Sequence, residues 1–165
     1  MSRGKRKAAE APRRAAYDKA LAMLARREHS RRELGTRLQQ AGYDEEESSL
    51  ALARLGEQDY QDDRRFGEML VRSRASQGYG PARIRAELKT HGIVDAVAGE
   101  LINDVDVDWP ASAAAQLRKR YGDRGAADIK ERARRAQFLL RRGFDAATVR
   151  SLTRADTGDA GDAAD

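Results

Sequence analysis

Apolar residues recur at intervals of three and four positions along most of the chain, as they do on one face of an α-helix. Leu34 and Leu38 form one such pair, and Phe66 and Leu70 form another. No stretch alternates apolar and polar residues for the length of a strand, and valine and isoleucine together number only ten. The pattern therefore predicts an all-α protein.

One phrase occurs three times: a basic helical stretch, a glycine, a bulky apolar residue, an aspartate and a second helical stretch. The glycines are Gly42, Gly92 and Gly143. The aspartates are Asp44, Asp95 and Asp145. A glycine after a helix can adopt the left-handed conformation that closes the helix, and the apolar residue after it packs on the last turn. We expect each aspartate to cap the helix that follows it.

A further helical stretch precedes each phrase, so the chain is expected to contain three repeats of three helices. The expected ranges of the repeats are 15–58, 59–107 and 108–154. Helices joined by short turns in this way bury their apolar faces mainly against their neighbours. Pro81 and Pro110 fit the first turns of helices, where a missing N–H costs little.

The composition favours thin local cores over one large core. Hydrophobic residues make up 40% of the 165 residues, but 30 of them are alanines. The chain has no cysteine, which excludes disulfides and Cys-ligated metals and fits a reducing cytosol, so a cytoplasmic location is expected. No apolar run approaches the roughly 20 residues that cross a bilayer, so no membrane association is expected.

The two ends of the chain differ sharply in charge. Residues 1–14 carry six basic residues and one acidic residue, whereas residues 155–165 carry four aspartates and no basic residue. Neither segment has a helical apolar period. We therefore expect a basic disordered tail over 1–14 and an acidic disordered tail over 155–165.

Basic charge concentrates on the helix that precedes each repeated glycine. The isoelectric point is near 9.7, which favours polyanionic or acidic partners. The helix after Gly42 is acidic, and the one after Gly92 has no basic residue. A helix-turn-helix protein reads DNA with its second helix, so sequence-specific DNA binding is disfavoured. The candidate polyanion-binding residues are Arg31, Arg32, Arg85, Lys89, Arg118, Lys119, Arg120, Lys130, Arg134 and Arg141.

The last basic helix is expected to bury one apolar stripe. That stripe consists of Ile129, Ala133, Ala136 and Leu140. Lys130, Arg134 and Arg141 then share an adjoining face. Phe138 falls near this face, where it is either an exposed contact or a residue packed on another helix.

No pattern in the chain indicates an enzyme. The histidines, His29 and His91, lie in no metal-binding motif, and there is no catalytic triad, Walker loop or dinucleotide fingerprint. Asp62 and Asp63 are adjacent and fit the start of a helix better than a metal site. The stretch from Gly78 to Pro81 is interpreted as a turn and a helix start. We therefore expect no catalytic residue, no metal and no cofactor.

The chain resembles the bacterial RecX regulatory proteins over about residues 15–153. The resemblance is carried by the runs HSRRELGTRLQQAGY, DDRRFGEMLVRSRASQGYGPARIRAELKTHGI and FLLRRGF. The run from Asp62 to Ile93 is the most specific part. The third repeat is more divergent, because Arg135 stands where the first two repeats have Leu34 and Ile84.

The resemblance implies tandem three-helix repeats in an elongated, curved array. It also implies binding to the RecA recombinase filament on DNA, and inhibition of its ATPase, strand-exchange and co-protease activities in recombination, repair and the SOS response. On this hypothesis the protein is a monomer that lies along the filament groove through its basic face and binds bare DNA weakly. The alternatives are a general, non-sequence-specific DNA-binding protein and a repeat scaffold for an unrelated protein.

Overall fold

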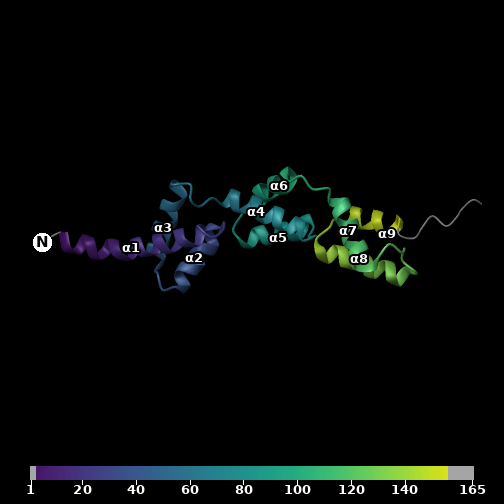
Figure 1. Ribbon diagram of the computed structural model, residues 1–165, viewed down its shortest axis with the longest axis horizontal. Coiled ribbons are helices and arrows are strands. Elements are labelled where there is room, and N and C mark those ends of the chain that lie inside the picture. The colour runs from purple at the N-terminus through teal and green to yellow at the C-terminus, as the bar shows by residue number, and fades with distance from the viewer. Residues whose placement is uncertain (1–2, 156–165) are drawn as a thin grey trace, which may run out of the picture. The chain divides into compact units, whose positions relative to one another are not determined.

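A computed structural model describes the backbone of residues 3–155 and the side chains of residues 14–154. This part of the chain forms nine α-helices and no strand, so the predicted all-α class is confirmed (Figure 1). The helices are α1 (Arg3–Leu24), α2 (Arg31–Gln40), α3 (Glu45–Glu57), α4 (Asp63–Ser76), α5 (Pro81–Thr90), α6 (Asp95–Asp104), α7 (Trp109–Tyr121), α8 (Ile129–Arg142) and α9 (Ala146–Ala155).

Contacts between residues divide the chain into two compact units. Unit 1 contains the residues up to 69 together with 88–97, and unit 2 contains 70–87 together with the residues from 98 onward. The division passes through α4, α5 and α6, each of which contributes residues to both units.

The core of unit 1 lies among α1, α2 and α3, which pack on one another. Its buried residues are Ala16, Ala20, Leu34, Leu38, Ala51, Leu52 and Leu55. Ala16 and Ala20 are four positions apart and therefore share one face of α1. Because alanine side chains are small, α1 and α3 lie close together along this face, side by side in Figure 1.

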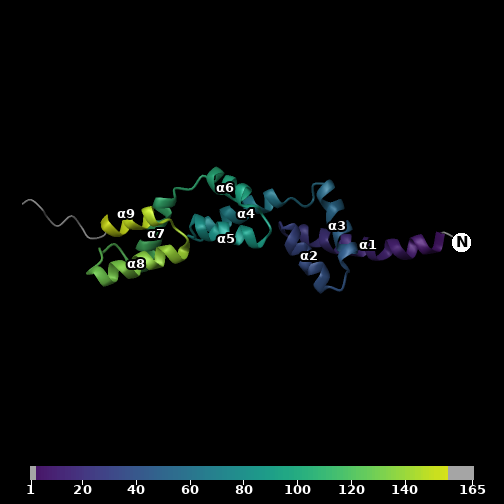
Figure 2. The ribbon, with the colours of Figure 1, turned by 180° about the vertical axis from the view of Figure 1, so that it is seen from behind.

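One buried cluster of unit 2 lies among α7, α8 and α9, which group together in the views of Figures 1 and 2. Its buried residues are Ala113, Leu117, Leu139, Phe144 and Val149. Trp109 is half-buried and packs against this cluster. As the composition predicts, these two clusters are small and built mainly from alanine and leucine.

The three repeated glycines close their helices in the same way. Gly42 and Gly143 have a φ of 95°, and Gly92 has a φ of 79°, so all three adopt the predicted positive φ. The amide of the next residue donates to the carbonyl five positions earlier, at 3.2 Å in every repeat. These bonds join Tyr43 to Leu38, Ile93 to Leu88, and Phe144 to Leu139. This is the hydrogen bond of a Schellman motif, and it shows the repeat at the level of the backbone.

The expected aspartate caps are confirmed at Asp44 and Asp145. The Asp44 carboxylate accepts from the Glu47 amide at 2.8 Å, and the Glu47 carboxylate accepts from the Asp44 amide at 3.0 Å. The Asp145 carboxylate accepts from the Thr148 amide at 2.9 Å. Asp95 is the first residue of α6.

The structure and the expected tails differ at the N-terminus. Helix α1 begins at Arg3, within the segment 1–14 that the sequence pattern predicts to be disordered. This segment is rich in alanine, lysine and arginine, which favour helix without needing an apolar face. At the other end, Ala155 is the last residue of α9, and the rest of the expected acidic tail lies outside the described residues.

The predicted buried stripe of α8 is wrong at Ile129, Ala133 and Leu140, whereas Ala136 is half-buried and packs against the cluster of α7, α8 and α9. Ile129 is 79% exposed and Leu140 is 44% exposed, and Ala133 is exposed as well. The buried residues of the helix are Arg135 and Leu139. The helix is rotated relative to the prediction because the interior position that aliphatic residues occupy in the other repeats is held here by an arginine.

The turn between α4 and α5 packs tightly against the end of α8 within unit 2. The amide of Gly80 donates to the carbonyl of Arg142 at 2.7 Å, and the amide of Ala82 donates to the carbonyl of Gly143 at 3.0 Å. A β-carbon on Gly80 would clash with the backbone of Gly143, and one on Gly143 would lie 2.5 Å from the backbone nitrogen of Arg83. Two backbones approach here at a distance that only glycine permits.

Candidate polyanion-binding surface

All ten basic residues selected from the sequence lie on helices and are exposed. Unit 1 contains Arg31, Arg32 and Lys89. Unit 2 contains Arg85, Arg118, Lys119, Arg120, Lys130, Arg134 and Arg141. The structure thus places the candidates in two groups, one in each unit. Their arrangement as one continuous basic face stays a prediction.

In unit 1 the start of α2 lies beside the end of α5. The guanidinium of Arg32 donates to the carbonyl oxygen of Thr90 at 3.2 Å and to that of Lys89 at 3.5 Å. Carbonyls in the last turn of a helix lack partners within the helix, so Arg32 stabilises the end of α5. The Arg31 amide donates to the Asp63 carboxylate at 2.8 Å. The structure therefore brings the candidates Arg32 and Lys89 together.

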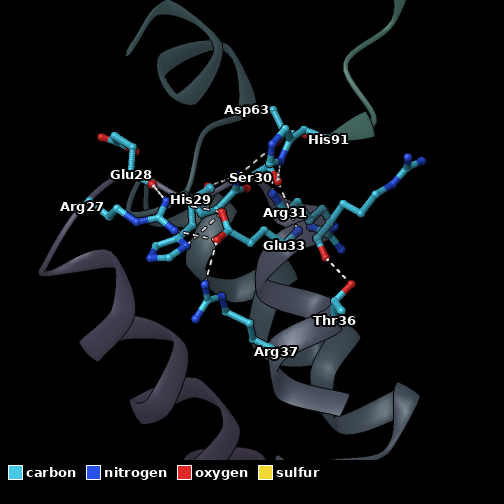
Figure 3. Close-up of polar contacts among 12 residues, drawn as sticks. Arg27, Glu28, His29, Ser30, Arg31, Glu33, Thr36, Arg37, Asp63 and His91 are labelled. Carbon is cyan, nitrogen blue, oxygen red and sulfur yellow. Dashed lines mark hydrogen bonds and ion pairs between the residues drawn. The ribbon is translucent and has the colours of Figure 1, made fainter. Parts of the chain in front are cut away.

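Glu33, one residue after Arg32, is surrounded by positive and imidazole groups (Figure 3). Its carboxylate lies 2.6 Å from the guanidinium of Arg27 and 3.3 Å from that of Arg37. Burial alone would raise the pKa of Glu33, but the hydrogen bond from Arg27 helps to outweigh burial, and the pKa is lowered. The Glu33 carboxylate is thus already neutralised by basic neighbours.

His29 is buried beside this carboxylate. Its Nδ1 lies 3.1 Å from Glu33, and the residue is 4% exposed. Burial lowers the pKa of His29 below its ordinary value of 6.5, although the charge of Glu33 acts in the opposite direction. The folded protein therefore favours the neutral imidazole.

Lowering the pH from about 7.5 to 5.5 is expected to reduce the free energy of unfolding partly through His29. Its pKa is lower in the folded than in the unfolded chain, so the unfolded chain binds the proton first as the pH falls below 6.5. Stability present above that pH is then lost as the pH falls toward the folded pKa. Urea unfolding at several pH values measures the slope. The variant His29→Gln should have a shallower slope, and an unchanged slope would assign the effect to other groups.

Two grooves flank α2 in unit 1 and contain basic residues that the sequence analysis did not select. The groove between α1 and α2, of ≈ 490 Å³, is lined by Lys19, Arg26 and Arg37, among others. A second groove, of ≈ 450 Å³, is lined by Arg32, Arg37 and His91, among others. Lys19 lies on α1, whereas Arg26 lies in the turn after that helix, so helical spacing does not relate the two residues and gave no signal for them.

In unit 2 the basic end of α7 is attached to α8 through aromatic rings. The guanidinium of Arg120 lies 4.9 Å from the ring centre of Phe138 and 5.7 Å from that of Tyr121. The two rings meet edge to face at 5.9 Å. Phe138 is half-buried, so of the two interpretations left open by the sequence, packing on another helix is confirmed. These contacts orient the side chain of Arg120, which is nevertheless exposed to solvent.

The outer face of α8 carries three of the candidates. Lys130, Arg134 and Arg141 are exposed, and their side chains make no hydrogen bond or ion pair with the residues that the structure describes. Their spacing of four and seven positions places them on one face of the helix, as predicted. Arg85 lies on α5, where its guanidinium approaches Gly99 of α6.

Within residues 14–154, no cluster of three or more histidine, aspartate or glutamate side chains could hold a metal ion. Asp62 instead accepts from the amides of Arg64 and Arg65, at 2.7 and 3.0 Å, which makes it a helix cap. None of the described helices is both long enough and apolar enough to span a bilayer.

Three family models match the chain in order. They are the first, second and third three-helix domains of RecX, matching residues 16–55, 62–102 and 106–152. The regulatory protein RecX of Stenotrophomonas maltophilia strain K279a is 44% identical over 141 residues, which are 86% of each chain. That of Halorhodospira halophila is 45% identical over 141 residues, which are 86% of this chain and 88% of the relative.

Solved structures share the fold. The crystal structure of RecX from Lactobacillus salivarius aligns with a TM-score of 0.74 at 23% identity, covering 90% of this chain and 98% of that one. A second crystal structure of a regulatory protein RecX aligns with a TM-score of 0.76 at 21% identity, covering 92% of this chain and 77% of that one. The tandem three-helix architecture predicted from the repeats is therefore confirmed.

Proposed function

The chain belongs to the RecX family of regulatory proteins, and from this we propose that it binds the RecA filament on DNA and inhibits its ATPase, strand-exchange and co-protease activities. We further propose that it acts as a cytoplasmic monomer, without a cofactor and without catalysis of its own. The proposed contact is a basic face that lies along the filament groove.

The observation that carries this proposal is the exposed positive charge on helices of both units. On α8, Lys130, Arg134 and Arg141 are exposed, and among the described residues their side chains form no hydrogen bond or close ion pair with an acid, although the charge of Arg134 acts on the nearby Glu131. In unit 1, the carboxylate of Glu33 on α2 is already engaged by Arg27 and Arg37. A surface of this kind attracts phosphates or acidic protein surfaces without reading a base sequence.

If both units contact the filament, the protein binds it at more than one site. Each contact is weak, but the second becomes intramolecular once the first has formed, which raises the overall affinity. A ligand that binds one conformation of the filament better than another shifts the equilibrium toward that conformation. Bridging adjacent subunits in one conformation would in this way slow the cycle of ATP hydrolysis.

Reversing charge on the outer face of α8 is expected to reduce inhibition of RecA. The double variant Lys130→Glu and Arg134→Glu should raise the concentration needed for half-inhibition of DNA-dependent ATP hydrolysis by about tenfold or more, because two attractive contacts become repulsive. The matched control is Arg72→Glu with Arg150→Glu, two exposed arginines of unit 2 outside the candidate set.

The two double variants change the net charge equally, so they separate a local contact from overall charge. The control should inhibit like the unmodified protein. Equal loss in both variants would mean that only net charge matters. Full inhibition by a folded Lys130→Glu, Arg134→Glu variant would remove this face of α8 from the proposed contact.

A general DNA-binding function is the second candidate, and the density of positive charge between residues 118 and 134 favours it. That function predicts tight binding to bare DNA that weakens steeply with salt. The logarithm of the binding constant should fall with the logarithm of the salt concentration by about 0.7–0.9 for each phosphate contacted. The RecA proposal instead predicts weak binding to bare DNA and much stronger binding when RecA is present. Titration of the protein onto labelled DNA, with and without RecA, distinguishes the two.

A further inference from the structure

The third repeat has an arginine at an interior position that is aliphatic in the other two. Leu34, Ile84 and Arg135 each lie eight residues before the repeated glycine of their repeat. Leu34 and Ile84 are fully buried, and Arg135 is only 3% exposed. Burying a guanidinium costs several kcal/mol unless hydrogen bonds and a counter-charge compensate for the lost water. The contacts of Arg135 show where that compensation comes from.

The buried guanidinium of Arg135 binds the loop between α7 and α8, which spans residues 122–128. Its Nη1 donates to the carbonyl of Arg124 at 2.9 Å, and its Nη2 lies 3.5 Å from the carbonyl of Gly125. Nη2 also donates to the carboxylate of Glu131 at 2.8 Å. The guanidinium carbon lies over the ring of Tyr121, 4.8 Å from the ring centre. Arg135 therefore contacts the loop at the adjacent carbonyls of Arg124 and Gly125, and it also contacts Tyr121 at the end of α7.

Glu131 completes this arrangement from the other side. Its second carboxylate oxygen accepts from the amide of Ala127 at 2.8 Å. That amide, followed by Arg135, lowers the pKa of Glu131, so the carboxylate stays ionised. The Asp128 side chain meanwhile accepts from the Glu131 amide at 2.7 Å. Four of the loop positions, 124, 125, 127 and 128, are thus held by side chains of α8 or by its cap.

The loop connects the two halves of the basic group in unit 2. Arg118, Lys119 and Arg120 lie at the end of α7, and Lys130 and Arg134 lie at the start of α8. The loop itself adds Arg124, which is also exposed. The acids in this stretch are occupied by structural contacts, except for Asp123. The conformation of the loop therefore sets the spacing between positive groups on either side of it.

We propose that the loop 122–128 and its flanking cations form a preorganised contact for a nucleic-acid strand, and that Arg135 is the positioning residue that fixes its shape. This inference rests on the proposed function and adds to it the part of unit 2 that meets the phosphates. Arg135 is buried and touches no phosphate itself. It acts through the carbonyls of the loop, and a loop already ordered before binding loses less entropy when it binds.

Phosphates rather than an acidic peptide are favoured by the chemistry of this surface. The exposed groups around the loop are guanidinium and ammonium groups, which suit phosphate oxygens. The half-buried aromatic rings, Tyr121 and Phe138, are occupied by guanidinium groups and by each other. A large apolar side chain of a peptide would find only Ile129 exposed at this place.

The test replaces Arg135 with methionine, which keeps the length of the buried stem and removes the hydrogen bonds. Arg135→Met should remain folded, because aliphatic residues occupy the same position in the other repeats. It should bind fluorescent oligo-dT about tenfold more weakly than the unmodified protein, and the amides of residues 124–128 should exchange hydrogen faster. Arg135→Lys keeps the charge but cannot bind both carbonyls. Its affinity for oligo-dT should therefore lie between that of Arg135→Met and that of the unmodified protein.

Arg132→Met is the matched control, since Arg132 is a half-buried arginine of the same helix whose Nε is buried without a hydrogen-bond partner among the described residues. It removes the same charge and should retain most of the affinity. Equal losses in both variants would overturn a positioning role in favour of simple charge. Tight binding by Arg135→Met despite faster exchange would also overturn it, as would unfolding of both Arg135→Met and Arg135→Lys. Preferential binding of a poly-Asp peptide over oligo-dT would assign the loop to a protein partner and reject the proposal.

Failure of this inference and failure of the proposed function give different results. If the unmodified protein inhibits RecA and Arg135→Met inhibits equally well, the loop is not the contact but the function stands. If the unmodified protein has no effect on RecA, the proposed function fails, and the comparison of the variants on oligo-dT still decides the role of Arg135.

Discussion

Replacing Gly143 with alanine is expected to lower the free energy of unfolding by about 3–4 kcal/mol, whereas the same change at Gly42 is expected to cost only about 1–2 kcal/mol. The two glycines hold equivalent places after the second helix of their repeats and have the same φ of 95°. The cost of forcing alanine into the left-handed region is therefore the same at both. Any further loss at Gly143 must come from its surroundings.

Those surroundings differ sharply between the two positions. A β-carbon on Gly42 would have no neighbour within 4 Å, whereas one on Gly143 would lie 2.5 Å from the backbone nitrogen of Arg83 and 2.6 Å from its β-carbon. Backbone atoms cannot move aside as a flexible side chain can. The clash would therefore separate the α4–α5 turn from the end of α8, breaking the bonds from Gly80 and Ala82.

Two spectroscopic signals measure the difference in stability between the two variants. Fluorescence of Trp109, the one tryptophan of the chain, follows unit 2, and far-ultraviolet circular dichroism follows all helices. Gly143→Ala should lower the urea midpoint of the fluorescence transition, and Gly42→Ala should leave that transition in place. If both variants lose the same stability, the contact between the turn and α8 is more compliant than the structure indicates.

The repeat itself was predictable because its signals are local. A glycine followed by an apolar residue and an aspartate closes one helix and starts the next through hydrogen bonds that span five residues or fewer. The bonds from Tyr43, Ile93 and Phe144 are therefore alike in all repeats. The close contact of Gly80 with Gly143 joins residues 63 positions apart, and no local sequence pattern predicts it. The sequence therefore predicted Gly80 only as part of a turn.

The candidate site also combines features that local sequence predicts with features that depend on contacts between helices. That Arg134 and Lys130 share an outer face follows from helical spacing alone. That Arg37 and Lys19 line one groove depends on how α1 packs on α2, which the spacing within each helix does not determine. The stripe of Ile129 and Leu140 was predicted to be buried because apolar residues usually are, but a paired arginine can take an interior position when a loop supplies carbonyl oxygens.

Replacing Leu34 with arginine is expected to cost about 3–5 kcal/mol and to unfold much of unit 1, although arginine stands at the equivalent position of the third repeat. Leu34 is fully buried among the side chains of α1, α2 and α3. The new guanidinium would need a carboxylate and loop carbonyls within reach. Glu33, the adjacent carboxylate, is already engaged by Arg27 and Arg37.

Leu34→Met separates charge from length, because methionine is unbranched like arginine but apolar. It is expected to cost less than about 1.5 kcal/mol. Urea unfolding followed by circular dichroism compares the two variants. A large loss in Leu34→Arg with a small one in Leu34→Met would show that the core of unit 1 rejects the charge. If Leu34→Arg were as stable as Leu34→Met, this position would tolerate a cation without the loop contacts that Arg135 makes. The interior arginine would then need no special loop, so the pair of variants tests the physical reason why one repeat departs from the other two.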